Sequence, residues 1–251
     1  MSTTIDVATL DLIENALLNA RFEMDEVVRR AAMSPTIRVQ HDEFPMIFNA
    51  RGQMVVGQFG SYIPEVIDRF GGEISEGDVI LLNDPYLCKG SISHCNDWLV
   101  ILPVFHEGVH VAFSSLFGHM MDVGGKVPGS QVSDALSIWE EGIRIPPIKI
   151  FDRGILNETA LDVILNNTRT PETNRSDLMA IIGAAVRRSG GSSRSASALG
   201  QRRSRWRAMH SSSGRGGRWR TSSARTSRRS PRPSPTGSTM TAAATAPSRW
   251  C

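Results

Sequence analysis

The first apolar pattern along the chain predicts a long N-terminal helix over residues 6–33. Its apolar residues recur every three or four positions, as one face of an α-helix requires, and charged residues lie between them. Ser34-Pro35 should end this helix, because the residue before a proline is driven out of the α region. We interpret the apolar stripe as a face that packs on a core; the alternative is a coiled-coil interface, which so short a stripe disfavours. The stripe comprises Ile13, Leu17, Ala20, Met24, Val27 and Ala31.

Shorter apolar runs with turn signals indicate strands after the helix. Residues 46–48 and 54–56 flank a turn at residues 49–52, and residues 98–105 and 109–116 flank the turn Glu107-Gly108. Further strands are expected at 37–39 and 79–82, and an extended segment at 143–150. Helices are expected at 63–70, 133–141, 160–166 and 176–186. Ser133 should cap the helix at 133–141, and Ser176 or Asn174 the helix at 176–186. The predicted fold class is α+β, a mixed α/β domain with antiparallel hairpins and an N-terminal helix.

The pattern His-x-x-Asp occurs twice around the second hairpin. His94 and Asp97 precede the outgoing strand, and His119 and Asp122 follow the returning one. An antiparallel pairing therefore brings all four to one edge of the sheet. Imidazole and carboxylate together suit borderline divalent ions such as zinc, manganese or iron. The pattern predicts a metal site; the alternative is that these are hydrogen-bonded turn residues.

Other polar residues around the hairpin are further candidates. Asn83 and Asp84 follow a buried strand on a proline-fixed turn, where they could orient a substrate or a metal-bound water, or simply form the turn. Gly124 and Gly125 would let backbone amides approach a substrate closely. Lys126, like Arg144, could meet a carboxylate or phosphate, or could be solvated at the surface.

Several ordered motifs with matching gaps resemble those of the hydantoinase B/oxoprolinase family over about residues 6–186. The family includes the B component of N-methylhydantoinase, half of 5-oxoprolinase, and large subunits of acetone and acetophenone carboxylases. The motifs are Asn83-Asp84-Pro85-Tyr86, His94-x-x-Asp97, Gly118-His119-x-x-Asp122-x-Gly124-Gly125, Pro128-Gly129-Ser130 and Glu140-Glu141-Gly142-x-x-Ile145-Pro146-Pro147.

The resemblance implies metal ligands at His94, Asp97 and His119, as in the carboxylase branch. It also implies an acidic ligand upstream, for which Asp42 or Glu43 is the nearest candidate, and spacing alone leaves Asp122 as an alternative. Substrate-binding roles are expected for Gly124, Gly125 and Lys126, and catalytic roles for Asn83, Asp84 and Asp122. The expected cofactor is a divalent metal, manganese or zinc, or else iron.

The same resemblance implies a reaction in two stages. A hydantoinase A-like partner subunit would bind ATP and phosphorylate the oxygen of a small amide, lactam or ketone, and this chain would then act on the activated species. The sequence has no P-loop pattern, in keeping with ATP binding on the partner. We predict a hydrolase that opens a cyclic amide. One alternative is a carboxylase that joins a phosphorylated enol to CO2. The cysteine at Cys88 and the single histidine at His119, in place of a His-His pair, favour it. The other is an inactive fragment that only binds its partner through the Ile13–Ala31 stripe.

The charge of the chain divides it at residue 186. Residues 1–186 hold 13 Lys and Arg against 25 Asp and Glu, a net charge of −12, whereas residues 187–251 hold 15 Arg and no acid, a net charge of +15. The second part contains no Ile, Val, Phe or Tyr and is rich in Ser, Arg, Gly and Ala. Such a segment buries no core, so its composition predicts disorder.

Three interpretations of this tail compete. An arginine-serine arm would bind nucleic acid through phosphates, and a plain linker would do nothing specific. We favour the third, a GC-rich gene read in the wrong frame, which yields Arg, Ser, Gly, Ala and Pro with stray Trp and Cys. Codons for residues 189–200 can be chosen so that a one-nucleotide shift encodes an amphipathic helix ending in glycine. On this interpretation the chain is a truncated subunit, and nucleic acid is not its partner.

Targeting signals are not apparent in the sequence. No window approaches the roughly 20 apolar residues of a membrane span, and the polar N-terminus is unlike a secretory signal. Three cysteines make no disulfide framework. The prediction is a cytoplasmic protein without membrane contact.

Overall fold

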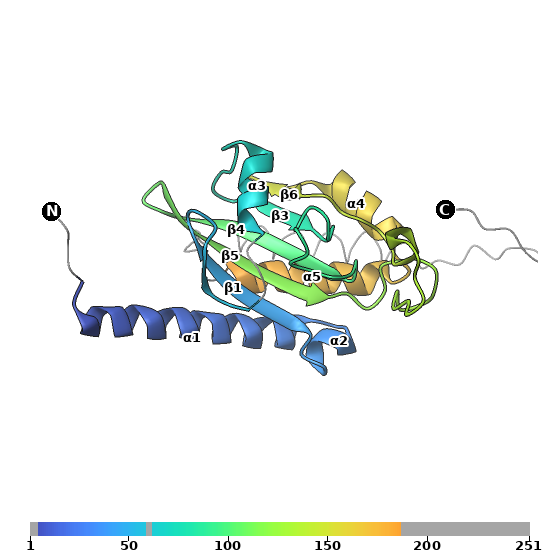
Figure 1. The fold of residues 1–251 in the computed structure, drawn as a ribbon, viewed down its shortest axis with the longest axis horizontal. Coiled ribbons are helices and arrows are strands. Elements are labelled where there is room, and N and C mark those ends of the chain that lie inside the picture. The colour runs from blue at the N-terminus through green and yellow to red at the C-terminus, as the bar shows by residue number, and fades with distance from the viewer. Residues whose placement is uncertain (1–4, 59–61, 187–251) are drawn as a thin grey trace, which may run out of the picture. The chain divides into compact units, whose positions relative to one another are not determined.

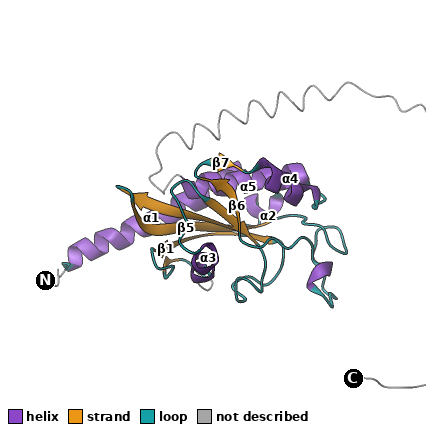
Figure 2. Ribbon diagram, turned by 90° about the horizontal axis from the view of Figure 1, so that it is seen from above, coloured by secondary structure: helices purple, strands orange, loops and turns teal. Residues whose placement is uncertain are grey.

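The computed structural model describes residues 5–58 and 62–186, which fold into a seven-stranded antiparallel sheet with helices on its two faces (Figures 1 and 2). The strand order is β2-β1-β5-β4-β3-β6-β7. The strands are β1 (Glu43–Asn49), β2 (Met54–Val56), β3 (Val79–Leu82), β4 (Asp97–His106), β5 (Val109–His119), β6 (Ile148–Asp152) and β7 (Ile155–Leu156). The helices are α1 (Val7–Ala31), α2 (Pro35–Arg38), α3 (Ile63–Phe70), α4 (Glu158–Asn166) and α5 (Pro171–Val186), with a 3-10 turn at Ile138–Glu140. The α+β prediction is confirmed.

The β4–β5 hairpin is the centre of the sheet. Its turn residues Glu107 and Gly108 both have positive φ, +50° and +77°, as the tight turn of a two-residue hairpin requires. From this turn the strands pair back to Asp97, whose Cα partner is His119. The start of β4 and the end of β5 therefore lie together, as the sequence predicted.

Alternation along the strands gives the sheet two apolar faces. Trp98, Val100 and Leu102 of β4 face a core completed by α1, α4 and α5, whereas Leu99 and Ile101 face a second core completed by α3. Each fully buried large side chain contributes on the order of 1.5–3 kcal/mol to stability. Burial on both faces explains why the sequence of β4 is a nearly continuous run of apolar residues.

Helix α5 runs along α1 in the opposite direction. Near one end of the contact, Asp177 accepts a hydrogen bond of 2.6 Å from the amide of Met33. Near the other, Ser114 donates to the carbonyl of Ala185 and lies 3.9 Å from the sulfur of Met24. Only the C-terminal half of α1 is buried, and its N-terminal half projects past the sheet (Figure 1). Four large apolar side chains on that half are exposed: Val7, Leu10, Leu12 and Ile13.

Three local predictions were wrong. Residues 37–39 form the end of α2 and its C-cap rather than a strand, because Ser34 caps the amide of Ile37 and Pro35 begins the helix. The helix expected over 133–141 is only the 3-10 turn, capped by Ser137 instead of Ser133. Helix α5 begins at Pro171 rather than at Ser176. Neither Ser176 nor Asn174 caps it, and the buried Asn174 and Asp177 serve tertiary contacts.

The predicted disorder of the tail lies outside the described residues. Among the described helices, none combines the length and apolarity that a membrane crossing requires.

Glu43 is a buried carboxyl group at the start of β1. The residue is 6% exposed, and its Oε2 has no hydrogen-bond partner among the described residues. Burial raises its pKa to about 7, and the negative charges of Asp25 and Asp42 add to the effect. The folded chain therefore retains a proton on Glu43 at pH values where an exposed glutamate has lost it.

We expect Glu43→Gln to raise the free energy of unfolding by about 1–3 kcal/mol at pH 8 and to change it little at pH 4. The pKa is higher in the folded chain than the ordinary 4.5, so the wild-type chain loses stability as the pH rises from about 4.5 through about 7. Urea unfolding at both pH values measures this difference. The exposed Glu14→Gln serves as the control, and an equal gain from Glu43→Gln at both pH values would contradict the explanation.

Candidate metal centre

Three side chains meet where β4 begins and β5 ends. His94 comes from the loop between β3 and β4, Asp97 is the first residue of β4, and His119 is the last of β5. The Oδ1 of Asp97 lies 3.3 Å from the Nε2 of His94 and 3.0 Å from the Nδ1 of His119. The two ring nitrogens are 3.2 Å apart. One ligand atom of each residue thus converges on a single point.

This triangle fits a divalent metal ion. Nitrogen and oxygen ligands at about 2.0–2.2 Å from zinc lie roughly 3–3.5 Å from each other, which matches all three separations. The donor set of two imidazoles and one carboxylate suits zinc, manganese or iron. The side chain of His119 is only 5% exposed and that of Asp97 13%, but that of His94 is 41% exposed. The centre is therefore closed by the sheet and open on the side of His94.

The local electrostatics favour a cation at this point. The hydrogen bond to Asp97 raises the pKa of His94 against the opposing effect of burial. Burial works to raise the pKa of Asp97, but hydrogen bonds from His119 and His94 outweigh it and hold that pKa below its usual range. Asp97 is consequently an anion at neutral pH, and it faces the position that a metal ion would share.

Asp42 lies beside this triangle. Its backbone carbonyl accepts a 2.9 Å hydrogen bond from the amide of His119, and its Oδ2 is 3.6 Å from the Nδ1 of His119. The side chain is 47% exposed, so it has room to turn. The structure thus brings Asp42 next to His119, whereas the carboxylate of Glu43 lies close to Asp25 of α1.

The residues predicted to be catalytic are engaged in holding loops. Asn83 donates to the carbonyls of Cys95 and Ile143 and accepts from the amide of Ile145. Asp84 accepts two hydrogen bonds from Arg144. These contacts fix the loop that carries His94.

Asp122 plays the same part on the other side of the centre and lies outside the group of three. Its carboxylate accepts hydrogen bonds from the amides of Gly124 and Gly129, from the hydroxyl of Ser130 and from Arg169. Burial opposes this, yet the hydrogen bonds lower the pKa of Asp122. The four donors account for its acceptor capacity.

The predicted substrate-binding residues pack against neighbouring segments. A Cβ on Gly124 would meet the carbonyl oxygen of Asn167 at 2.8 Å, and one on Gly125 would overlap the backbone of residues 140–142. Lys126 is exposed and bridges Asp134 and Glu140. The close approach of neighbouring backbone segments is therefore enough to explain why residues 124 and 125 are both glycine.

Comparison with known proteins identifies the family of the chain. The family model described as hydantoinase B/oxoprolinase matches residues 6–193. The chain belongs to the hydantoinase B/oxoprolinase family. It is 36% identical over 190 residues to caprolactamase subunit beta of Pseudomonas jessenii, covering 72% of this chain and 32% of that protein. It is 30% identical over 203 residues to 5-oxoprolinase 1 of Arabidopsis thaliana, covering 72% and 16%.

Two solved structures share the fold. The crystal structure of ATP-dependent caprolactamase from Pseudomonas jessenii superimposes with a TM-score of 0.66 at 34% identity, over 73% of this chain and 33% of that one. Nucleotide-free acetone carboxylase gives a TM-score of 0.61 at 20% identity, over 70% and 25%, which shows the fold alone. The chain thus spans about a third of the length of the caprolactamase chain that it matches.

Two residues that hold the loops around the centre could not be identified from the sequence. Asn96 donates to the carbonyls of Met120 and Gly129, and so joins the loop that carries His94 to the loop that follows His119. Arg169 donates to Asp122 and to the carbonyls of Gly124, Gly125 and Val127. An asparagine beside a motif histidine is a weak signal for Asn96, and no local pattern marks Arg169.

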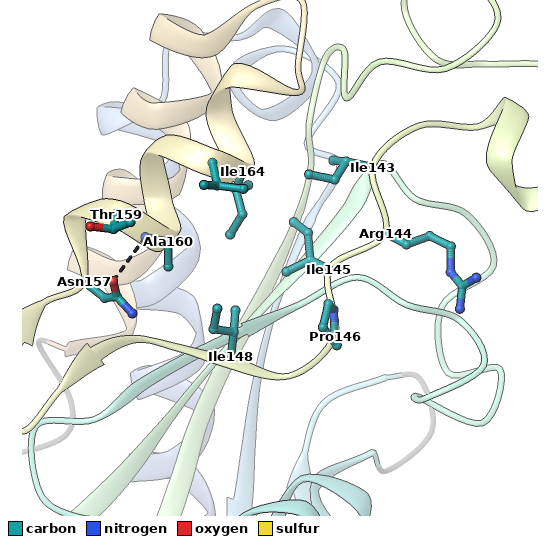
Figure 3. Close-up of a pocket in the computed structure, with 10 residues that line it drawn as sticks. Ile143, Arg144, Ile145, Pro146, Ile148, Asn157, Thr159, Ala160 and Ile164 are labelled. Carbon is teal, nitrogen blue, oxygen red and sulfur yellow. Dashed lines mark hydrogen bonds between the residues drawn. The ribbon is translucent and has the colours of Figure 1, made fainter.

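An apolar groove lies apart from the metal centre. It has a volume of about 410 Å³ between the 143–148 segment and α4, and Ile145, Ile148 and Ile164 form much of its wall (Figure 3). The side chain of Arg144 points away from these isoleucines (Figure 3), towards Asp84. None of the three converging residues lines the groove.

Proposed function

We propose that this chain supplies the metal centre of an ATP-dependent amidohydrolase that opens a cyclic amide. A partner subunit related to hydantoinase A would first use ATP to activate the amide oxygen. The observation that carries the proposal is the convergence of His94, Asp97 and His119 on one point. Similarity to caprolactamase subunit beta supports a lactam as the substrate.

The residues of the chain account for the chemistry of such a centre. When bound, a divalent metal supplies a Lewis acid that polarises an oxygen or activates water. Asp97 balances the charge of the cation and orients both imidazoles, because its Oδ1 lies within 3.3 Å of each. The exposed side of His94 leaves access for a substrate. Asp42 is the fourth ligand on this proposal.

A carboxylase is the second candidate. It would join a phosphorylated enol to CO2 at the same centre. The single histidine of Gly118-His119-Met120 favours it, and the chain is 31% identical over 169 residues to the acetophenone carboxylase delta subunit of Aromatoleum aromaticum, covering 62% of this chain and 24% of that protein.

We further propose that the 251-residue chain is a truncated product, disabled by a frame change near residue 186. The abrupt change from a net charge of −12 to one of +15 supports this. Turnover should then be weak or absent even with the partner and ATP. Full turnover by the purified chain would refute the truncation, and resequencing codons 180–205 would test the frame directly.

The first test is metal uptake by the purified chain. After removal of metals with a chelator, we expect about one equivalent of Zn²⁺ or Mn²⁺ to bind, as detected by calorimetry and elemental analysis. A His94→Ala/His119→Ala double variant should bind none, whereas the exposed His106→Ala should bind as the wild type does. Equal uptake by all three proteins would rule out this centre.

The reaction itself distinguishes the two candidates. With a frame-restored subunit, its ATP-binding partner and ATP, a hydrolase opens caprolactam, hydantoin or 5-oxoproline. A carboxylase instead incorporates labelled bicarbonate into a ketone such as acetone. Ring opening without incorporation supports the first proposal, and incorporation without ring opening supports the second.

A further inference from the structure

We propose that Gln131 and Ser93 are positioning residues that fix which ring nitrogen each histidine offers to the metal. His119 would bind through Nδ1 and His94 through Nε2. The inference rests on the proposed metal centre and deepens it, because it assigns the hydrogen-bond partners that set the two tautomers.

The two nitrogens of His119 face different surroundings. Its Nδ1 points to the centre, where it lies 3.0 Å from Asp97 and 3.2 Å from His94. Its Nε2 faces the other way and lies 3.4 Å from the side-chain nitrogen of Gln131. A ring that binds a metal through Nδ1 carries its proton on Nε2, and that proton needs an acceptor.

The side-chain amide of Gln131 meets this need in either state of the histidine. In the arrangement described, the NH2 group of Gln131 can donate to a bare Nε2 of His119. A half-turn of the amide brings its carbonyl oxygen to the same place, where it accepts from a protonated Nε2. Binding of a metal at Nδ1 would therefore be accompanied by that half-turn.

His94 is arranged in the opposite sense. Its Nε2 points to the centre, 3.3 Å from Asp97, and its Nδ1 lies 3.0 Å from the hydroxyl of Ser93. A hydroxyl accepts as readily as it donates, so Ser93 can receive the Nδ1 proton when Nε2 binds a metal. Each outward nitrogen thus has one polar partner, and each partner comes from this chain.

The hydrogen-bonded loop that Asp122 organises holds Gln131 in place. The hydroxyl of Ser130, the preceding residue, shares its one proton between the carbonyl of Gly124 and Asp122, at 2.6 and 3.2 Å. Arg169 also donates to both of those residues. Asn96 reaches from the His94 loop to the carbonyl of Gly129. Asp122 and Arg169 consequently support His119 through Gln131, although neither touches the centre.

The test compares two substitutions of nearly equal size, with Zn²⁺ alone as the ligand. Gln131→Met removes the acceptor, and we expect it to weaken Zn²⁺ binding about 10-fold or more in a chelator competition. Gln131→Glu keeps an acceptor and should bind at least as tightly as the wild type. Ser93→Ala should weaken binding by a similar factor. The exposed Gln58→Met and Ser133→Ala are the controls and should change nothing.

NMR of ¹⁵N-histidine-labelled protein supplies a readout that does not depend on the stability of the fold. With Zn²⁺, we expect the long-range spectrum to show a proton on Nε2 of His119 and on Nδ1 of His94, assigned with single histidine variants. A wild-type chain that takes up Zn²⁺ but shows the reverse pattern, or a Gln131→Met chain with unchanged affinity, would overturn the inference alone. A wild-type chain that takes up no Zn²⁺ overturns the proposed metal centre as well.

Discussion

Asp97→Ala is expected to weaken Zn²⁺ binding by more than about 100-fold, beyond the 10- to 100-fold typical of an outer-sphere partner. Asp97 is the only anion of the converging three, and its Oδ1 contacts both ring nitrogens. Without it, the two imidazoles have neither a charge that balances the cation nor a common partner that orients them. The affinity is measured at pH 7.5 by competition with a chromogenic chelator.

Two further variants separate charge from folding in this experiment. Asp97→Asn keeps the size and one oxygen, so we expect an intermediate loss of affinity. Asp162→Ala removes an exposed carboxylate on α4 and should bind Zn²⁺ normally. Circular dichroism of each variant verifies that the sheet is intact. A folded Asp97→Ala chain with wild-type affinity would show that the metal binds elsewhere.

The second large effect is expected at Gly125. Its φ is +81°, and a Cβ would lie 2.8 Å from the carbonyl carbon of Glu141 and even closer to the carbonyl oxygen of Glu140. Backbone cannot yield as a flexible side chain does. We therefore expect Gly125→Ala to lower the free energy of unfolding by about 3 kcal/mol or more, as measured by urea unfolding.

Gly129→Ala is the matched control. Gly129 has φ +83°, but no atom of the described part of the chain lies within 4 Å of the position that a Cβ would take. It carries the same left-handed conformation without the clash, so about 1 kcal/mol is expected. The difference between the two variants isolates the contact of the 124–125 turn with residues 140–142. Equal losses would mean that conformation alone, and not packing, requires glycine at Gly125.

The sequence was most informative where a pattern is periodic. Helix α1 and the β4–β5 hairpin could be predicted because apolar spacing and a turn at Glu107-Gly108 record secondary structure directly. The predicted core-facing stripe of α1 was only partly right, since Ala20 and Met24 are buried but Ile13 and Ala31 are exposed. The meeting of Asp97 and His119 followed from antiparallel pairing, and the His-x-x-Asp spacing placed His94 near them. Metal binding itself stays a prediction.

Other features depend on contacts between segments that the sequence does not reveal. The clamp of Arg169 on the loop at Gly124 joins residues 45 positions apart, and the capping of the α1–α2 junction by Asp177 joins residues 144 apart. The strand expected at residues 37–39 failed because capping by Ser34 and Pro35 outweighed β-propensity over so short a run. A neighbouring cap thus decided this segment, whereas distant partners decided the other two features.

The register of the β4–β5 hairpin has a consequence for how loops of this chain can vary. Asp97 and His119 are paired residues, counted back from the turn at Glu107-Gly108, and the two ends of the hairpin are about 30 Å apart at the usual rise per residue. A one-residue slip moves the side chains of a strand to the opposite face of a sheet. A shift of the β4–β5 pairing by one residue would thus separate Asp97 from His119 without changing either residue.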